Sequence, residues 1–141
     1  MKHWVIDASV ATKWFLQDAP DEPDTGKSLY LLELAIAGEA HFVQPAHWIS
    51  EVAAVLARRI PDTAADNITD LLLFDFFIMI ADPRIYRRAI GLAQELDHHL
   101  FDTLYHAVAL DQKAVMITAD ARYYAKAAKL GGIQLLQNVA S

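Results

Sequence analysis

Short apolar runs alternate along the chain with stretches whose apolar residues recur every three or four positions. The short runs predict strands at residues 3–6, 41–43 (continuing to Pro45), 76–80, 114–117 and 133–136. The helical spacing predicts helices at residues 27–37, 49–60, 63–73, 84–97, 102–112 and 121–130. Residues 17–26 contain two prolines, four acids and a glycine, which predicts a surface loop.

This order of elements predicts an α/β fold. Strands that read as near-continuous apolar runs and alternate with helices are typical of a parallel sheet with helices on both faces. With 141 residues and no linker or repeat, we expect a single domain spanning residues 1–141. Ligands bind such sheets at the carboxyl ends of the strands. Two predicted strands lead there into an acid, Asp7 and Asp120, so we expect a site at this edge.

Composition narrows the class of protein. The chain is 55% hydrophobic and has no cysteine, which predicts a sizeable core and excludes disulfides and thiolate metal sites. No apolar stretch approaches the roughly 18 residues of a membrane span, and no signal peptide is evident, so we expect a cytoplasmic protein without membrane contact. The net charge of −6 argues against a simple nucleic-acid-binding module. It argues less against a metallonuclease, whose acids gather in a site that the metal neutralises.

Four acids are candidates for a metal site: Asp7, Glu51, Asp102 and Asp120. Carboxylate oxygens suit Mg²⁺, and a bound divalent ion offsets their mutual repulsion. Each acid taken alone also has an ordinary structural interpretation. Asp7 precedes Ala8 and Ser9 as a helix cap would, Glu51 is compatible with an exposed helix position, and Asp102 suits the first turn of a helix. The joint spacing of the four acids favours the metal site.

Four segments in order resemble the PIN domains of the VapC toxin group. They are residues 5–10 (VIDASV) with 13–15 (KWF), Pro45 with 50–53 (SEVA), 101–109 (FDTLYHAVA) and 118–124 (TADARYY). The resemblance implies a Rossmann-like three-layer α/β/α fold and Mg²⁺- or Mn²⁺-dependent endonucleolytic cleavage of RNA. It also implies a homodimer and inhibition by a small antitoxin protein. One departure is Thr103, where alanine is more usual in the family.

Matched position by position, the resemblance assigns both metal binding and catalysis to Asp7, Glu51, Asp102 and Asp120. Ser9 and Thr118 would be polar helpers that orient a carboxylate or a metal-bound water. Lys13 and Arg122 each closely follow a strand-end acid, so we expect them to contact phosphate. In this hypothesis a metal-activated water cleaves the RNA phosphodiester bond. The number of ions, and RNA over DNA as the substrate, are left open.

Other functions fit the residues less well. A phosphatase with Asp7 as nucleophile generally needs a second aspartate where Ser9 stands. His98, Asp102 and His106 are spaced four apart, as zinc ligands on one helix face would be, but His98 is expected to precede the helix. The main alternative is a PIN-fold binding module without catalysis, acting through protein or RNA contacts. Retention of all four acids disfavours it, because a scaffold has no need to crowd carboxylates.

Overall fold

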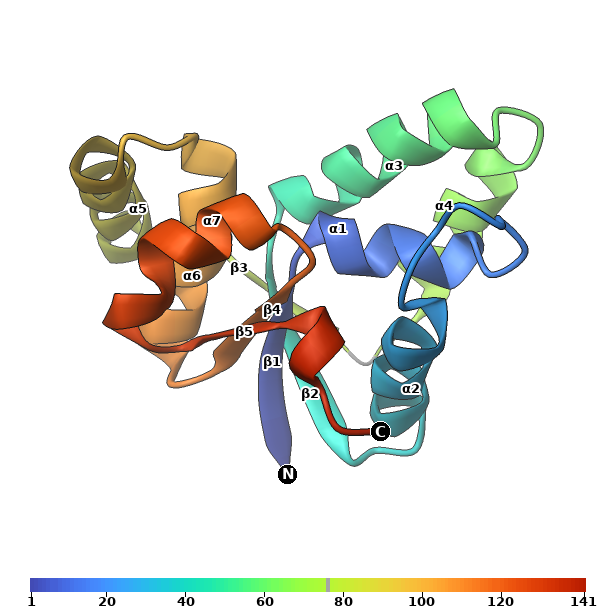
Figure 1. Cartoon of the computed structure of the whole chain (residues 1–141), viewed down its shortest axis with the longest axis horizontal. Helices are drawn as coiled ribbons and strands as arrows, with labels where there is room; N and C mark the ends of the chain where they lie inside the picture. The colour runs from blue at the N-terminus through green and yellow to red at the C-terminus, as the bar shows by residue number, and fades with distance from the viewer. Residues whose placement is uncertain (76) are drawn as a thin grey trace.

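A computed structural model of the chain describes residues 1–75 and 77–141. Its described strands form one parallel sheet in the order β3-β2-β1-β4-β5 (Figure 1). The strands are β1 (Lys2–Ile6), β2 (Ala40–Pro45), β3 (Phe77–Ile80), β4 (Val115–Thr118) and β5 (Ile133–Leu135). All carboxyl ends therefore meet at one edge of the sheet, as the sequence predicts.

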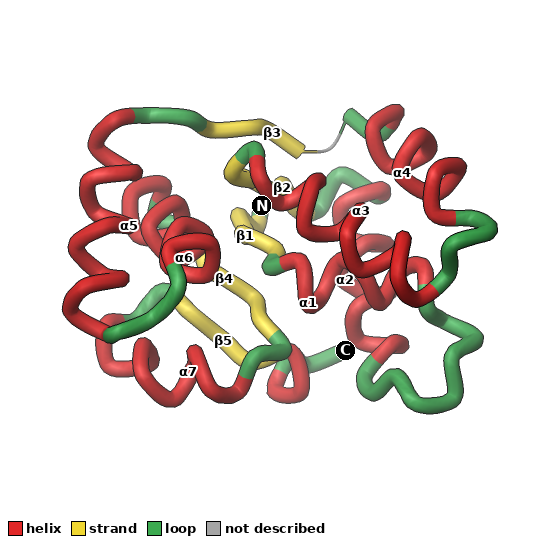
Figure 2. The backbone as a smooth tube through the Cα atoms, turned by 90° about the horizontal axis from the view of Figure 1, so that it is seen from above, coloured by secondary structure: helices red, strands yellow, loops and turns green. Residues whose placement is uncertain are grey.

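Helices cover both faces of this sheet. One face carries α1 (Ala8–Ala11), its 3₁₀ continuation η1 (Thr12–Phe15), α2 (Thr25–Ile36), α3 (His47–Arg59) and α4 (Ala64–Leu73). The other carries α5 (Pro83–Leu96), α6 (Leu100–Gln112) and α7 (Ala121–Ala127). Seen from above, the sheet lies between the two groups (Figure 2). The predicted three-layer α/β/α architecture with a central parallel sheet is confirmed.

The central strand β1 positions the site. Trp4, Val5 and Ile6 are buried because β1 is flanked by β2 and β4 and covered by helices on both faces. Ile6 pairs with Ile117 of β4, and the N–H of Asp7 donates to the Ile117 carbonyl at 3.0 Å. The acid that follows β1 is thereby fixed beside the end of β4.

A buried glutamine completes the end of β1 on its other side. Backbone pairing of β1 with β2 extends to Trp4 and Phe42. Two residues further, the Gln44 amide donates to the Ile6 carbonyl at 2.8 Å, and its oxygen accepts from the Ile6 N–H at 2.7 Å. A side chain thus replaces a backbone pair where β1 and β2 diverge, which satisfies both polar groups of Ile6.

The predicted boundaries differ from the structure in a few places. The apolar pattern assigned no element to residues 8–15, which form α1 and η1. The predicted loop at 17–26 is shorter, because α2 begins at Thr25. Helix α6 begins at Leu100, two residues before the predicted start. Phe76, the first residue of one predicted strand, lies outside the described residues. Among the residues described, no helix is long and apolar enough to cross a membrane.

Candidate metal and nuclease site

Asp7 is held by two hydroxyl groups at the carboxyl edge of the sheet. Thr118 Oγ1 donates to Asp7 Oδ2 at 2.7 Å, and Ser9 Oγ donates to the same oxygen at 2.8 Å. Each hydroxyl also accepts a backbone N–H, Ser9 from Ala119 and Thr118 from Asp120, both at 3.0 Å. Since a hydroxyl has one proton to donate, these acceptor roles direct both protons to Asp7. Ser9 and Thr118 therefore orient the carboxylate, and Asp7 Oδ1 remains for a ligand.

The helix-cap interpretation of Asp7 is wrong. Asp7 occupies the residue before α1, but its side chain makes no capping hydrogen bond. Its carboxylate instead contacts Ser9 and Thr118, as described above. The position is that of a cap, while the side chain is turned to the edge of the sheet.

Glu51 is a half-buried side chain of α3 held by Tyr105 of α6. The Tyr105 hydroxyl donates to Glu51 Oε1 at 2.6 Å, and His47 Nε2 lies 3.3 Å from the same oxygen. Burial opposes ionisation of Glu51, but hydrogen bonds from His47 and Tyr105 outweigh it and hold the pKa of the carboxyl below its usual range. Burial, with the charges of Asp7 and Glu51, raises the pKa of Tyr105, so its phenol keeps the proton that it donates.

Asp102 and Asp120 come from the first turn of α6 and the residue before α7. His98 Nε2 lies 2.7 Å from Asp102 Oδ2. Asp120 caps α7, because its Oδ1 accepts from the N–H groups of Arg122 and Tyr123, both at 3.0 Å. Both capping bonds use one oxygen, so Asp120 can act as a cap and still offer Oδ2 to a ligand.

All four predicted acids line one cleft of about 340 Å³, together with Ser9 and apolar residues of α1 and α3. They reach it from different elements: the end of β1, α3, α6 and the start of α7. Burial raises the pKa of Asp7 to about 6 against the two hydroxyl hydrogen bonds, and the charges of Asp102 and Glu51 raise it further. Carboxylates this close together repel one another when ionised, and a bound cation offsets that repulsion. Their oxygens are the donor set that Mg²⁺ and Mn²⁺ prefer, so the residues present fit such an ion.

Lys13 is placed differently from the expected phosphate contact. Its side chain is 4% exposed, and Nζ lies 2.7 Å from both Glu22 Oε2 and the Pro23 carbonyl. A phosphate could reach Nζ only if these contacts broke. Arg122 is exposed on α7 and lines a polar hollow with His98 and Lys126. This hollow adjoins the acids, so Arg122 remains a proposed phosphate contact.

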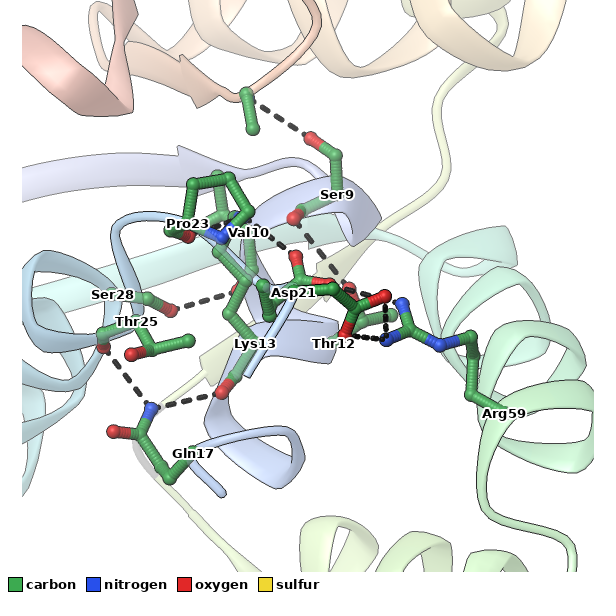
Figure 3. Close-up of polar contacts among 12 residues, drawn as sticks. Ser9, Val10, Thr12, Lys13, Gln17, Asp21, Pro23, Thr25, Ser28 and Arg59 are labelled. Atoms are coloured by element: carbon green, nitrogen blue, oxygen red, sulfur yellow. Dashed lines mark hydrogen bonds and ion pairs between the residues drawn. The ribbon is translucent and has the colours of Figure 1, made fainter. Parts of the chain in front are cut away.

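The loop before α2 is held through the same lysine. Glu22 also accepts from Arg59 at 3.0 Å, and Arg59 reaches Asp21 at 3.1 Å. Gln17 donates to the carbonyls of Lys13 and Thr25 (Figure 3). The acidic loop is therefore partly neutralised by a buried lysine and an arginine of α3. Since Glu22 and Asp21 are paired with Lys13 and Arg59, the negative charge of the loop adds little to the negative charge of the cleft.

The possible zinc site of His98, Asp102 and His106 is not formed in the structure. His106 is buried, with Nε2 2.8 Å from the Gly131 carbonyl and Nδ1 2.8 Å from the Tyr123 hydroxyl. A carbonyl only accepts, so Nε2 carries the proton and Nδ1 accepts from Tyr123. Both ring nitrogens are thus used within the core. His98, in contrast, lines the polar hollow with Arg122 and Lys126 and contacts Asp102.

Sequence reasoning missed three contacts at the acids, namely Tyr105 and His47 at Glu51, and the role of His98 beside Asp102. The only signal for the histidines was an offset of four residues from each acid. Nothing local indicated Tyr105, which lies 54 residues from Glu51 in the chain.

A family model for the PIN domain matches residues 4–130, which include all four acids and both hydroxyl residues that orient Asp7. The chain belongs to the PIN domain family. No curated protein sequence is a significant match to it.

Solved structures with the same fold are distant in sequence. A toxin–antitoxin complex from Klebsiella pneumoniae contains a chain with a TM-score of 0.68 and 16% identity, covering 99% of this PIN domain chain and 100% of that chain. VapC20 of Mycobacterium tuberculosis, described as a toxin that cleaves the sarcin–ricin loop, gives 0.66 and 17%, covering 88% and 94%. VapBC2 of Rickettsia felis, solved bound to promoter DNA, gives 0.63 and 14%, covering 94% and 96%. At these identities the likeness concerns the fold.

Proposed function

We propose that this PIN domain is a Mg²⁺- or Mn²⁺-dependent endoribonuclease and the toxin of a toxin–antitoxin pair. The observation that carries the proposal is the convergence of four carboxylates from four elements on one cleft, with Asp7 buried and aligned by two hydroxyls. A scaffold has no use for this arrangement, since crowding acids without a cation costs stability. Similarity of fold to a toxin described as cleaving the sarcin–ricin loop supports RNA as the substrate.

The chain's own residues divide the work as follows. Asp7, Glu51, Asp102 and Asp120 hold the cation, with Ser9 and Thr118 fixing Asp7 and Tyr105 fixing Glu51. When bound, the ion supplies positive charge at the phosphodiester and lowers the pKa of a water. One of the carboxylates accepts the proton of the water whose oxygen bonds to phosphorus; the P–O bond to one ribose oxygen breaks, and that leaving oxygen takes a proton from solvent. Arg122, beside Asp120, contacts a phosphate of the RNA.

Cleavage of labelled RNA and DNA by the wild type and by Asp102→Asn tests the proposal, each with Mn²⁺, with Mg²⁺ and with chelator. We expect RNA to be cut only with metal, and the rate to fall at least 100-fold in the variant. Asp62→Asn, an exposed acid outside the cleft, is the matched control. Equal cleavage by wild type and Asp102→Asn would place the activity elsewhere. No cleavage by the wild type, once freed of any co-purified inhibitor, would favour the binding module.

The antitoxin partner is supported by a second feature. Small and apolar residues of α3, α4 and their connection line a hollow of about 570 Å³: Ala53, Ala57, Pro61, Ala64, Ala65 and Ile68. An apolar helix or extended segment binds such grooves through its side chains. Two of the similar folds were solved as toxin–antitoxin assemblies. The proposed occupant of the hollow is therefore an apolar segment of a small antitoxin. We also propose that the toxin itself forms a homodimer, and sedimentation of the purified protein tests this.

A further inference from the structure

His98 lies in the three-residue connection between α5 and α6, but it is not a surface residue. Asp97 before it adopts a left-handed conformation with φ of 49° and ends α5. The turn brings His98 inward, where its side chain is only 5% exposed and its ring lies 4.8 Å from that of Tyr123. The buried ring of His98 therefore lies beside Asp102, one of the four proposed metal ligands.

Lys126 of α7 determines which nitrogen of His98 carries the proton. Its Nζ donates to the Asp97 carbonyl at 2.8 Å and lies 3.2 Å from His98 Nδ1. An ammonium group can only donate, so His98 Nδ1 must be the acceptor. The ring proton is then on Nε2, which lies 2.7 Å from Asp102 Oδ2 and donates to it.

By distance alone, His98 could be either a metal ligand or a hydrogen-bond donor to Asp102, and the position of its ring proton distinguishes these two roles. Ligand atoms of His98, Asp102 and Asp120 lie within 4.8 Å of one another, a spacing at which all three could bind one ion. A histidine binds a metal ion through a nitrogen lone pair. In His98 the lone pair is on Nδ1 and points to Lys126, while an N–H points to the acids. Direct ligation by Nε2 would place a ring proton against the ammonium of Lys126.

We infer that His98 is a positioning residue for Asp102, with its tautomer and ring orientation set by Lys126. By tying Asp102 Oδ2, it fixes the carboxylate so that Oδ1 can reach a cation in the cleft. The inference rests on the proposed metal-dependent function. It assigns carboxylate oxygens to the ion and excludes the nitrogens of His98 as ligands. Hydrogen-bond partners that orient ligands in this way typically change metal affinity about 10- to 100-fold when they are removed.

Titration of the RNA-free protein with Mn²⁺, followed by electron paramagnetic resonance at one fixed pH, measures the effect. His98→Ala is expected to weaken Mn²⁺ binding about 10- to 100-fold. His98→Gln is expected to restore most of the affinity, because its amide N–H can donate to Asp102 while its oxygen accepts from Lys126. His99→Ala, the exposed neighbour, is the matched control and should bind as the wild type does. Circular dichroism of each variant verifies folding, and His98→Gln carries the test if His98→Ala unfolds.

Spectroscopy distinguishes positioning from ligation. In ¹⁵N-histidine-labelled metal-free protein, NMR should show His98 with its proton on Nε2, and Lys126→Met should loosen this preference. Spin-echo modulation of the Mn²⁺-loaded protein should show no directly bound nitrogen. A bound nitrogen that disappears in His98→Gln would overturn the inference, as would wild-type affinity in His98→Ala. A wild type that binds no Mn²⁺ would overturn the proposed cofactor itself, a result distinct from either.

Discussion

Asp7 combines burial with two hydroxyl hydrogen bonds, and these act in opposite directions on its ionisation. Loss of water around the carboxylate raises its pKa, whereas donation from Thr118 and Ser9 lowers it. The effect of burial is the larger, so the pKa of Asp7 rises from an ordinary 3.8 to about 6. In the absence of a cation, ionised Asp7 therefore costs the folded state free energy at neutral pH.

The cost predicts how Asp7→Asn changes stability in chelator. The unfolded carboxyl ionises from about pH 4, while the folded one keeps its proton to about pH 6, so wild-type stability falls as pH rises between these values. Asparagine has no such loss. The stability of Asp7→Asn relative to wild type should therefore grow from pH 4 to pH 7, by up to about 3 kcal/mol.

Urea unfolding at pH 4.5, 5.5 and 7 measures this difference, and any pH-independent effect of the asparagine cancels in the comparison. Asp62→Asn, exposed, serves as control. A difference that stays constant across the range would contradict the proposed burial of the charge. Mn²⁺ at pH 7 should stabilise the wild type more than Asp7→Asn.

The hydroxyl of Tyr105 predicts a second residue-scale effect. Tyr105→Phe keeps the ring against His47 and removes the hydroxyl, which donates to Glu51 and accepts a backbone hydrogen bond from Ala8. Because a hydrogen bond to a charged acceptor contributes about 1.5–3 kcal/mol, the free energy of unfolding at pH 7 should fall by about that amount. The same substitution in a Glu51→Gln background should cost clearly less. Equal costs in both backgrounds would show that the hydrogen bond to the carboxylate is not what stabilises the pair.

The ordered set of acids, and Ser9 and Thr118 as orienting residues, could be predicted from the sequence, but the contacts of Tyr105 and His98 with the acids could not. Asp7 and Asp120 follow apolar strands, so parallel pairing brings them to one edge. Glu51 and Asp102 were assigned by their joint spacing with the other two acids and by the resemblance, since neither follows a predicted strand. The burial of Lys13 depends on a loop whose path no local pattern encodes. Glu51 and Tyr105, joined by a hydrogen bond, are 54 residues apart, and no local pattern relates them.

At the scale of elements, η1, the loop at residues 16–24 and α3 form one unit around Lys13. Its ammonium lies between Glu22 and the Pro23 carbonyl, and Glu22 also accepts a hydrogen bond from Arg59 of α3. Burial of the Lys13–Glu22 pair makes it more sensitive to loss of one partner than the exposed Arg59–Asp21 pair, where Asp21 is 75% exposed.

This contrast predicts an order of effects. Lys13→Met leaves Glu22 without its buried partner and should lower stability by about 3 kcal/mol. Arg59→Ala should cost about 1 kcal/mol or less. Limited proteolysis with a glutamate-specific protease, together with urea unfolding, measures both loop release and stability. The reverse order, with Arg59→Ala the more damaging, would contradict the assignment of Lys13 as the main support of the loop.

For the whole molecule, the parallel sheet and both helical layers follow from the pattern of apolar runs, because parallel strands must be connected by crossovers that cover the sheet. The strand order β3-β2-β1-β4-β5 was not predicted, because the pattern marks strands without saying which of them are neighbours. The helix at residues 8–15 escaped prediction because α1 and η1 are too short for helical periodicity to appear. The start of α6 was placed late because apolar Leu100 and Phe101 precede the acid that marked it. These errors, one missed short helix and a few shifted boundaries, leave the predicted α/β/α fold unchanged.

The hollow between α3 and α4 gives a prediction about the assembled complex. Ala57→Arg places a long charged side chain at this apolar surface from an exposed helix position, so the fold should persist. Co-expression with the proposed antitoxin, followed by affinity capture, should give a complex with the wild type and lose it with Ala57→Arg. Thr69→Arg, exposed on α4 outside the hollow, is the control. Persistent capture by Ala57→Arg would place the partner elsewhere.

The hydrogen bonds that join residues 7, 9 and 118–120 also have a consequence for biosynthesis. The first acid of the cleft is translated 111 residues before Thr118, so its two orienting partners are united only when β4 pairs beside β1. Until Thr118 and Asp120 have emerged from the ribosome, a nascent chain has neither a fixed Asp7 nor the fourth carboxylate. The site of the proposed nuclease would thus be assembled only after the segment that carries Thr118, 111 residues beyond Asp7, has been translated.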